Sequence, residues 1–203
     1  MEGHGGSAGL QARRYGADVI RVALLLIAAL LLKGESAELV SAKHKLELIE
    51  MEKLKRGKRV SVTARELNAY VREEVVKIAP EGVSDPRLEL GMGRALGFAR
   101  IDFLKVKQAQ GKPSGWLMQK LLQGERPVAV TVRVQSGGGQ ARVDVERVEI
   151  SGVAVEGAAL DFLIQQYLIP NYPEAKIGQP FKLAHHVDRL EVKPAGVVAI
   201  IGK

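Results

Sequence analysis

A segment of alternating valines between residues 127 and 150 constrains the fold of this chain more than any other feature. Valines occupy every second position from Val128 to Val134, which is typical of a strand with one apolar face. A Ser-Gly-Gly-Gly turn follows at 136–139, and valines return at Val143 and Val145. Two alternating runs joined by a glycine-rich turn predict a β-hairpin.

The second strand of this hairpin changes phase along its length. Val148 and Ile150 fall on the opposite alternation from Val145. An inserted residue in a strand has this effect, so we expect a long second strand with a bulge and a strong bend. Gly152 then interrupts the pattern before a short apolar piece, Val153–Val155.

Shorter elements of both kinds surround the hairpin. Thr63, with Glu66 three residues later, forms a capping-box pattern that predicts the start of a helix. The segments "SDPRLEL" and "GFARIDFLKVK" are strand-like, and the change of phase after Phe103 indicates a second bulge. The segment "GAALDFLIQQYLIP" predicts a helix that ends at Pro170, and a terminal hairpin is expected over residues 181–200.

The order helix, antiparallel strands, helix, hairpin predicts an α+β fold. We expect a curved, mainly antiparallel sheet packed against two helices, preceded by an N-terminal apolar helix and an amphipathic stalk helix. The corresponding divisions are a leader at 1–35, a basic amphipathic helix at 36–57 and a single domain at 58–203.

The leader contains an apolar run from Val19 to Leu32, interrupted by Arg21. Such a run is shorter than the roughly 20 residues that cross a bilayer as a helix, and it resembles the apolar core of a signal peptide. The basic pair at 13–14 precedes it, as in such peptides. We therefore expect the chain to be exported, with this segment either cleaved or retained as a membrane anchor. Its location is then membrane-anchored, or periplasmic or otherwise extracytoplasmic.

The segment 36–57 carries apolar residues at helical spacing. Leu39, Ala42, Leu46 and Ile49 recur every three or four residues, and Gly57 is placed to end the helix. The pattern predicts either a helical stalk or a helix packed on the domain.

Basic residues are concentrated where this helix meets the domain. The chain has a net charge of +7, and residues 43–59 contain seven basic against three acidic side chains. Such a cluster suits the anionic headgroups of a membrane, and a solvated helix face is an equally good interpretation. Nucleic-acid binding is not expected, because the basic residues are not interleaved with aromatics. The proposed membrane-surface cluster comprises Lys53, Lys55, Arg56, Lys58 and Arg59.

No catalytic motif is present in the sequence. The glycines between residues 91 and 97 have the wrong spacing for a dinucleotide loop and precede a strand rather than a helix. His186 and Asp188 share a strand face, but too few further histidines and no cysteines are available to complete a metal site. We therefore expect a non-enzymatic protein without a metal or another cofactor.

The layout from residue 58 to residue 203 resembles that of known envelope proteins. The phrases that carry the resemblance are "SVTARELNAYV" and "GQPFKLAHHVDRLEVKPAGVVAI", which flank the strands. They are similar to small bacterial envelope proteins of the LmeA-like and YpmS-like kind, and through the former to TULIP-type lipid-binding domains. The resemblance implies a curved sheet wrapped against a long helix, with an apolar groove for lipid acyl chains and no catalytic residues.

These observations favour a membrane-proximal module of the cell envelope that binds lipid or another apolar ligand. Its partners would be membrane lipids, through both anionic headgroups and acyl chains. The alternative is a structural or assembly factor in which helix 36–56 pairs with another envelope protein. The groove of the leading hypothesis would be lined by Phe98, Phe103, Phe162 and Tyr167, with Trp116 or Tyr172 at its mouth.

Overall fold

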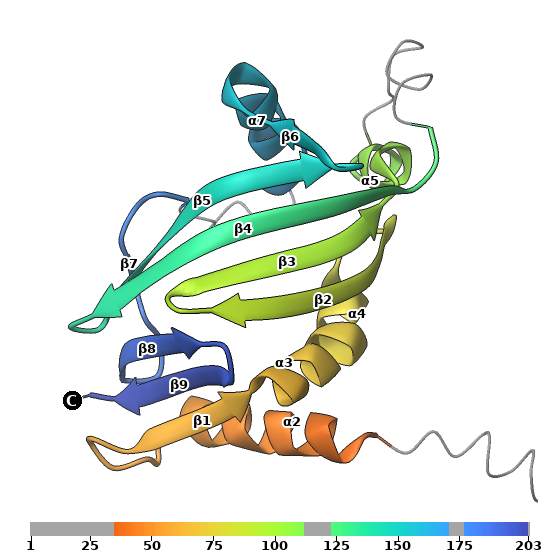
Figure 1. Cartoon of the computed structure of the whole chain (residues 1–203). Coiled ribbons are helices and arrows are strands. Elements are labelled where there is room, and N and C mark those ends of the chain that lie inside the picture. Colours follow the sequence, from red (N-terminus) through yellow and green to blue (C-terminus); the bar gives the residue numbers. More distant parts are fainter. Residues whose placement is uncertain (1–34, 112–122, 171–176, 203) are drawn as a thin grey trace, which may run out of the picture. The chain divides into compact units, whose positions relative to one another are not determined.

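The computed structural model describes residues 35–111, 123–170 and 177–202, and the segment from Ala37 to the C-terminus forms one compact unit. Its helices and strands appear in Figure 1. In chain order they are α2 (Ala37–Glu50), β1 (Arg59–Thr63), α3 (Ala64–Tyr70), η1 (Val71–Val75), α4 (Val76–Ile78), β2 (Val83–Gly91), β3 (Arg94–Ile101), α5 (Phe103–Ala109), β4 (Arg126–Gly137), β5 (Gln140–Ile150), β6 (Val153–Val155), α7 (Gly157–Leu163), η2 (Ile164–Leu168), β7 (Phe181–Lys182), β8 (Val187–Lys193) and β9 (Gly196–Ile201).

The strands of this unit form two sheets. The larger has the order β2-β3-β4-β5-β6, with β7 paired to β5, and the smaller has the order β1-β9-β8. Every pairing between these strands is antiparallel, which confirms the predicted α+β class with a mainly antiparallel sheet. The strand pattern predicted a single sheet. The second sheet arises because β1 pairs with β9 at the far end of the chain, and local patterns do not reveal such a pairing.

The central hairpin has the predicted form. Val130 of β4 pairs with Val148 of β5, and Val132 pairs with Val145. The two residues between Val145 and Val148 therefore face a single step of β4, which places a bulge at Glu146. The bulge accounts for the phase change in the sequence, because it returns the apolar side chains of both halves of β5 to the same face.

The segment after β3 departs from the prediction. Residues 103–106 were expected to continue the strand past a bulge, but the strand ends at Ile101 and helix α5 begins at Phe103. The Asp102 carboxylate accepts hydrogen bonds from the N–H groups of Leu104 and Lys105, each at 3.1 Å. These bonds satisfy N–H groups that have no partner within the helix, so Asp102 acts as the N-cap.

Helix α3 starts at the predicted capping box and is attached to the edge of the larger sheet. The Thr63 side chain accepts from the N–H of Glu66, and the Glu66 carboxylate accepts from the N–H of Thr63. Farther along the helix, the side-chain amide of Asn68 donates to the carbonyl of Leu88 and accepts from its N–H, both at 2.8 Å. Asn68 thus occupies hydrogen-bonding groups of the edge strand β2, where open edges invite pairing with other chains.

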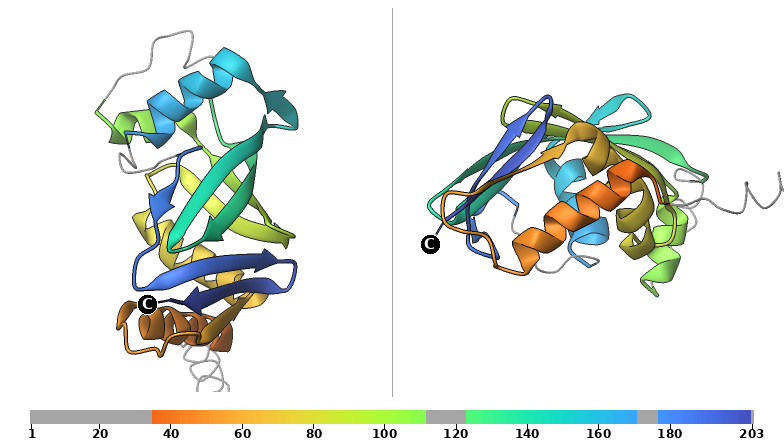
Figure 2. Two further views of the ribbon diagram at one scale, coloured as in Figure 1. Left: turned by 90° about the vertical axis from the view of Figure 1, so that its left-hand side faces the viewer. Right: turned by 90° about the horizontal axis from the view of Figure 1, so that it is seen from below.

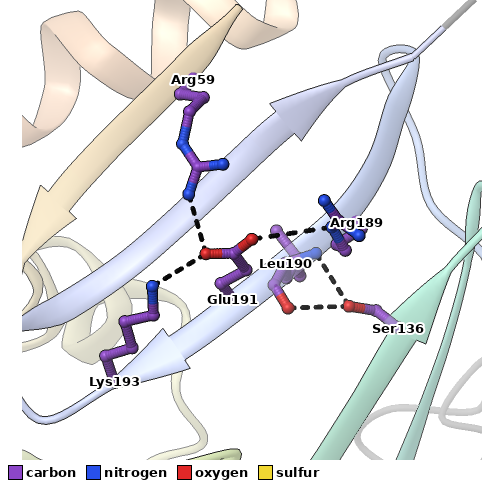
Figure 3. Close-up of polar contacts among 6 residues, drawn as sticks. All are labelled: Arg59, Ser136, Arg189, Leu190, Glu191 and Lys193. Atoms are coloured by element: carbon purple, nitrogen blue, oxygen red, sulfur yellow. Dashed lines mark hydrogen bonds and ion pairs between the residues drawn. The ribbon is translucent and has the colours of Figure 1, made fainter. Parts of the chain in front are cut away.

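A hydroxyl joins the two sheets. The Ser136 side chain, at the end of β4, donates to the carbonyl of Leu190 and accepts from its N–H, both at 2.8 Å (Figure 3). Glu191, the residue after Leu190 in β8, forms ion pairs with Arg59 at 2.8 Å and with Lys193 at 2.9 Å (Figure 3). The terminal hairpin is therefore fixed to both β1 and β4.

Helix α2 packs on α3 and β1 with Leu39 and Ala42 buried. Of the two predicted arrangements, these contacts correspond to a helix packed on the domain. The helix ends at Glu50, earlier than the predicted end at Gly57, because the chain turns at Glu52 with a positive φ of 54°. The residues that follow form a turn leading into β1.

Candidate functional site

An apolar cavity of about 350 Å³ lies between the larger sheet and the helices that face it. Figure 2 shows α5 and α7 on the same side of this sheet. The strands contribute Val83, Ile101, Val128, Val130, Val145, Val148 and Ile150. The helices and adjoining segments contribute Val75, Ala79, Pro80, Phe103, Val106, Leu160, Leu163, Ile164, Tyr167, Leu168 and Ile177. Among these side chains, only that of Tyr167 carries a polar atom.

The cavity exists because the helix formed by α7 and η2 does not pack tightly on the sheet. Five of its residues, from Leu160 to Leu168, line the cavity, yet none of the residues of α7 or η2 is buried. An amphipathic helix normally buries its apolar stripe in the core. Here the stripe faces an open space whose opposite wall is the valine face of β4 and β5.

An aromatic contact joins α5 to η2 at one wall of the cavity. The rings of Phe103 and Tyr167 meet edge to face, with centroids 5.1 Å apart and an interplanar angle of 83°. This geometry is favourable for aromatic pairs. Burial raises the pKa of the Tyr167 hydroxyl above its usual value.

A lysine lies beside the same aromatic pair. Lys107 is only 8% exposed, and its ammonium donates to the side-chain oxygen of Gln166 at 2.8 Å. The same nitrogen lies 5.0 Å from the centroid of the Tyr167 ring. Sequence reasoning missed this lysine because it placed the segment in a strand. In a helix, the spacing of Phe103, Val106 and Lys107 puts all three on one face.

The predicted groove residues are divided by the structure. Phe103 and Tyr167 lie together in the cavity wall. Phe162, on α7, is 46% exposed and is not among the lining residues. The two residues predicted at the mouth, Trp116 and Tyr172, lie outside the described residues.

Phe98 was predicted to line the groove, but it lies in a different hollow of the sheet. It lines a separate depression with Arg87 and Glu149, and the guanidinium carbon of Arg87 stands 3.9 Å from its ring centroid. The reason is the strand alternation, because Phe98 shares its phase with Arg100 and not with Ile101. A cation over the ring compensates for part of its exposure to water.

Charged pairs cover the face of the sheet opposite the cavity. Glu146, at the bulge, binds Arg94 of β3 at 2.7 Å and also pairs with Arg133 of β4. Hydrogen bonds from Arg94 and Arg133 lower the pKa of the Glu146 carboxyl below its usual value. The alternation in β3, β4 and β5 therefore separates a charged surface from an apolar one.

The predicted membrane-surface cluster lies on a turn and at the start of β1, rather than on a helix. All five of its basic residues are exposed, and Arg59 is paired with Glu191 at 2.8 Å. In Figure 1 this turn lies beside the smaller sheet, whereas the cavity lies between the larger sheet and the helices α5 and α7. The cluster and the cavity are therefore distinct sites.

A second hollow, of about 840 Å³, adjoins the smaller sheet. Two of its residues, His185 and His186, direct their Nδ1 atoms toward the Glu52 carboxylate at 3.4 and 3.6 Å. Its basic groups, Arg56 and Lys182, are accompanied by the acidic groups of Glu52 and Asp188. Although this hollow is the larger, its mixed charges define no single ligand chemistry. Within the part of the chain that the structure describes, no group of three or more His, Asp or Glu side chains could hold a metal ion.

No protein-family model, curated protein or solved structure matches this chain. None of the helices in the described residues is both long and apolar enough to cross a membrane. The apolar run at 19–32 lies outside the described residues.

Proposed function

We propose that this protein binds an apolar ligand of the lipid acyl-chain type in the cavity between the larger sheet and helices α5, α7 and η2. The observation that carries the proposal is the composition of the walls. Seventeen of the eighteen lining residues have wholly apolar side chains, and the exception, Tyr167, is largely ring. The volume of about 350 Å³ is within the range of small-molecule sites.

The chemistry of the walls favours a hydrocarbon over a polar ligand. Apolar surface removed from water on binding contributes a favourable free energy of roughly 25 cal/mol per Å². A polar group placed against these valines and leucines would lose its hydrogen bonds to water without replacement. In this proposal the larger sheet curves around the ligand, and the bulge at Glu146 contributes to the bend. The protein acts as a binding module and not as an enzyme.

We place this module at a membrane of the cell envelope. Three features support the location: the apolar run at 19–32, the resemblance of the layout to LmeA-like and YpmS-like proteins, and the exposed basic cluster. Basic residues close to an anionic surface contribute about 1 kcal/mol each to membrane association. The cluster would hold the unit near the membrane from which its ligand comes.

The test compares two substitutions at adjacent positions of α7. Leu163 lines the cavity, and Phe162 does not. We expect the unaltered full-length chain, isolated from membranes, to carry lipid that native mass spectrometry detects and solvent extraction identifies. Leu163→Trp should reduce the bound lipid because the larger side chain fills the cavity, whereas Phe162→Trp should leave it unchanged.

The lipid-binding proposal fails if the unaltered chain carries no lipid, or if both variants carry the same amount of it. A chain without lipid that forms a defined complex with another envelope protein would support the assembly-factor alternative. In that alternative, Leu39 and Ala42 would not take part in the pairing, because both are already buried within the unit.

A further inference from the structure

The apolar cavity has a limited length along the larger sheet. Its wall on β5 runs from Val145 to Ile150, a stretch that pairs with residues 128–132 of β4. Four steps along a strand cover about 13 Å. Val143, the next residue of β5 on the same face, is bridged by Ile177 and is not among the described lining residues. Ile177 does line the cavity, so it stands at this end of it.

The volume of the cavity corresponds to one hydrocarbon chain. An apolar protein cavity of about 150 Å³ binds benzene, a ring of six carbon atoms. In the same proportion, the cavity of about 350 Å³ holds roughly 12 to 14 carbon atoms. The hydrocarbon core of a bilayer is about 30 Å thick and two chains deep, so one chain of a membrane lipid extends about 15 Å. Length and volume therefore both agree with a single chain and leave no space for a second.

The walls provide no charged partner for a polar head group. None of the described lining residues is charged, and only Tyr167 has a polar atom in its side chain. A charged or zwitterionic head placed inside would lose its water without gaining an opposite charge. The head group therefore stays outside the cavity, and the walls recognise the chain alone.

We infer that the ligand of this cavity is a lipid with a single hydrocarbon chain, and that the cavity selects chains of about a dozen carbon atoms. The inference rests on the proposed function and specifies its ligand class. A lipid with two such chains would bury one of them and leave the other in water. It would therefore bind no better than its single-chain counterpart.

The alternative is a cavity that widens for any lipid, because the helix of α7 and η2 has no buried residue and could move away from the sheet. The edge-to-face contact of Phe103 with Tyr167 opposes such a movement, since it connects η2 to α5. The two explanations differ in what they predict for long chains. A fixed cavity gives an affinity that levels off with chain length, whereas a widening one gives an affinity that keeps rising.

The experiment measures the affinity of the full-length chain for lysophosphatidylcholines that share one head group and differ in chain length. The octanoyl, decanoyl, dodecanoyl, tetradecanoyl and hexadecanoyl compounds are titrated below their aggregation concentrations. We expect the affinity to rise about fourfold with each added methylene group up to roughly 12 to 14 carbon atoms, and then to level off.

Two variants of α7 test whether the cavity sets this limit. Leu163→Ala removes part of the wall, so the affinity should level off at chains about two or three carbon atoms longer. Phe162→Ala alters the neighbouring residue, which is 46% exposed and does not line the cavity, and should leave the limit unchanged.

Each outcome has a distinct meaning. An affinity that rises by the same factor up to the hexadecanoyl compound overturns this inference and leaves the apolar site in place. So does a two-chain lipid recovered from membranes in a one-to-one complex with the unaltered chain. Equal limits in Leu163→Ala and Phe162→Ala would also overturn it. Absence of binding by every compound overturns the proposed function and the inference together.

Discussion

The buried carboxylate of Glu66 joins helix α2 to the rest of the unit, and its replacement by glutamine should weaken that junction in a pH-dependent way. It is 7% exposed and accepts hydrogen bonds from the Lys45 ammonium at 2.7 Å, from the Ser41 hydroxyl and from the Thr63 N–H at 2.7 Å. Burial acts to raise the pKa of this carboxyl, but the hydrogen bonds together outweigh burial. They lower the pKa of Glu66 from 4.5 to about 2.

The size of the effect follows from this pKa. A carboxyl whose pKa falls from 4.5 to about 2 on folding stabilises the folded state by about 3 kcal/mol, at 1.36 kcal/mol per pKa unit. Because the folded-state pKa is the lower one, the unfolded chain binds more protons between these values. The contribution is therefore fully present above about pH 5 and is lost as the pH falls toward 2.

Urea unfolding of the full-length chain, followed by circular dichroism from neutral pH down to about pH 2, measures this contribution. We expect Glu66→Gln to lower the free energy of unfolding by about 3 kcal/mol at neutral pH and by progressively less as the solution becomes acidic. Glu73→Gln, at an exposed position shortly after α3, serves as the control. A loss that stays constant with pH, or one no larger than that of the control, would refute the assigned role of Glu66.

Two further substitutions test the backbone and the basic turn. Gly196→Ala should destabilise the protein by about 4 kcal/mol or more, because φ is 155° there and a Cβ would overlap the Val62 carbonyl oxygen. Gly57→Ala, with φ of 78° and no atom within 4 Å of the added Cβ, should cost about 1–2 kcal/mol; similar losses of Tm in the two variants would contradict this reasoning. Four exposed basic residues, Lys53, Lys55, Arg56 and Lys58, lie on the turn before β1. Replacing all four by glutamine should weaken binding to anionic vesicles by up to about 4 kcal/mol and leave binding to neutral vesicles unchanged. An unchanged preference for anionic vesicles in a co-sedimentation assay would rule out the turn as a membrane contact.

The sequence predicted those elements whose determinants lie close together in the chain. The hairpin at 127–150, its bulge and the capping box at Thr63 follow from neighbouring residues, and all three are present. Helix α5 was missed because the apolar alternation before it was extended past Asp102, although Asp is a common N-cap residue. The pairing of β1 with β9 joins distant segments, so periodicity within either segment does not predict it.

The candidate site shows a further reason for partial success. Its residues were predicted from their aromatic character. Whether a strand residue lines the cavity depends instead on whether its side chain projects from the same face of the sheet as the valines of β4. Phe98 has the wrong phase and lies beneath Arg87 in a separate hollow, while the aliphatic Val148 has the right one. The bulge at Glu146 keeps this phase correct along all of β5, because Val145 and Val148 are three residues apart and would project from opposite faces of a regular strand. The apolar wall therefore depends on this bulge, and the Glu146 side chain at the bulge pairs with Arg94 on the outer surface.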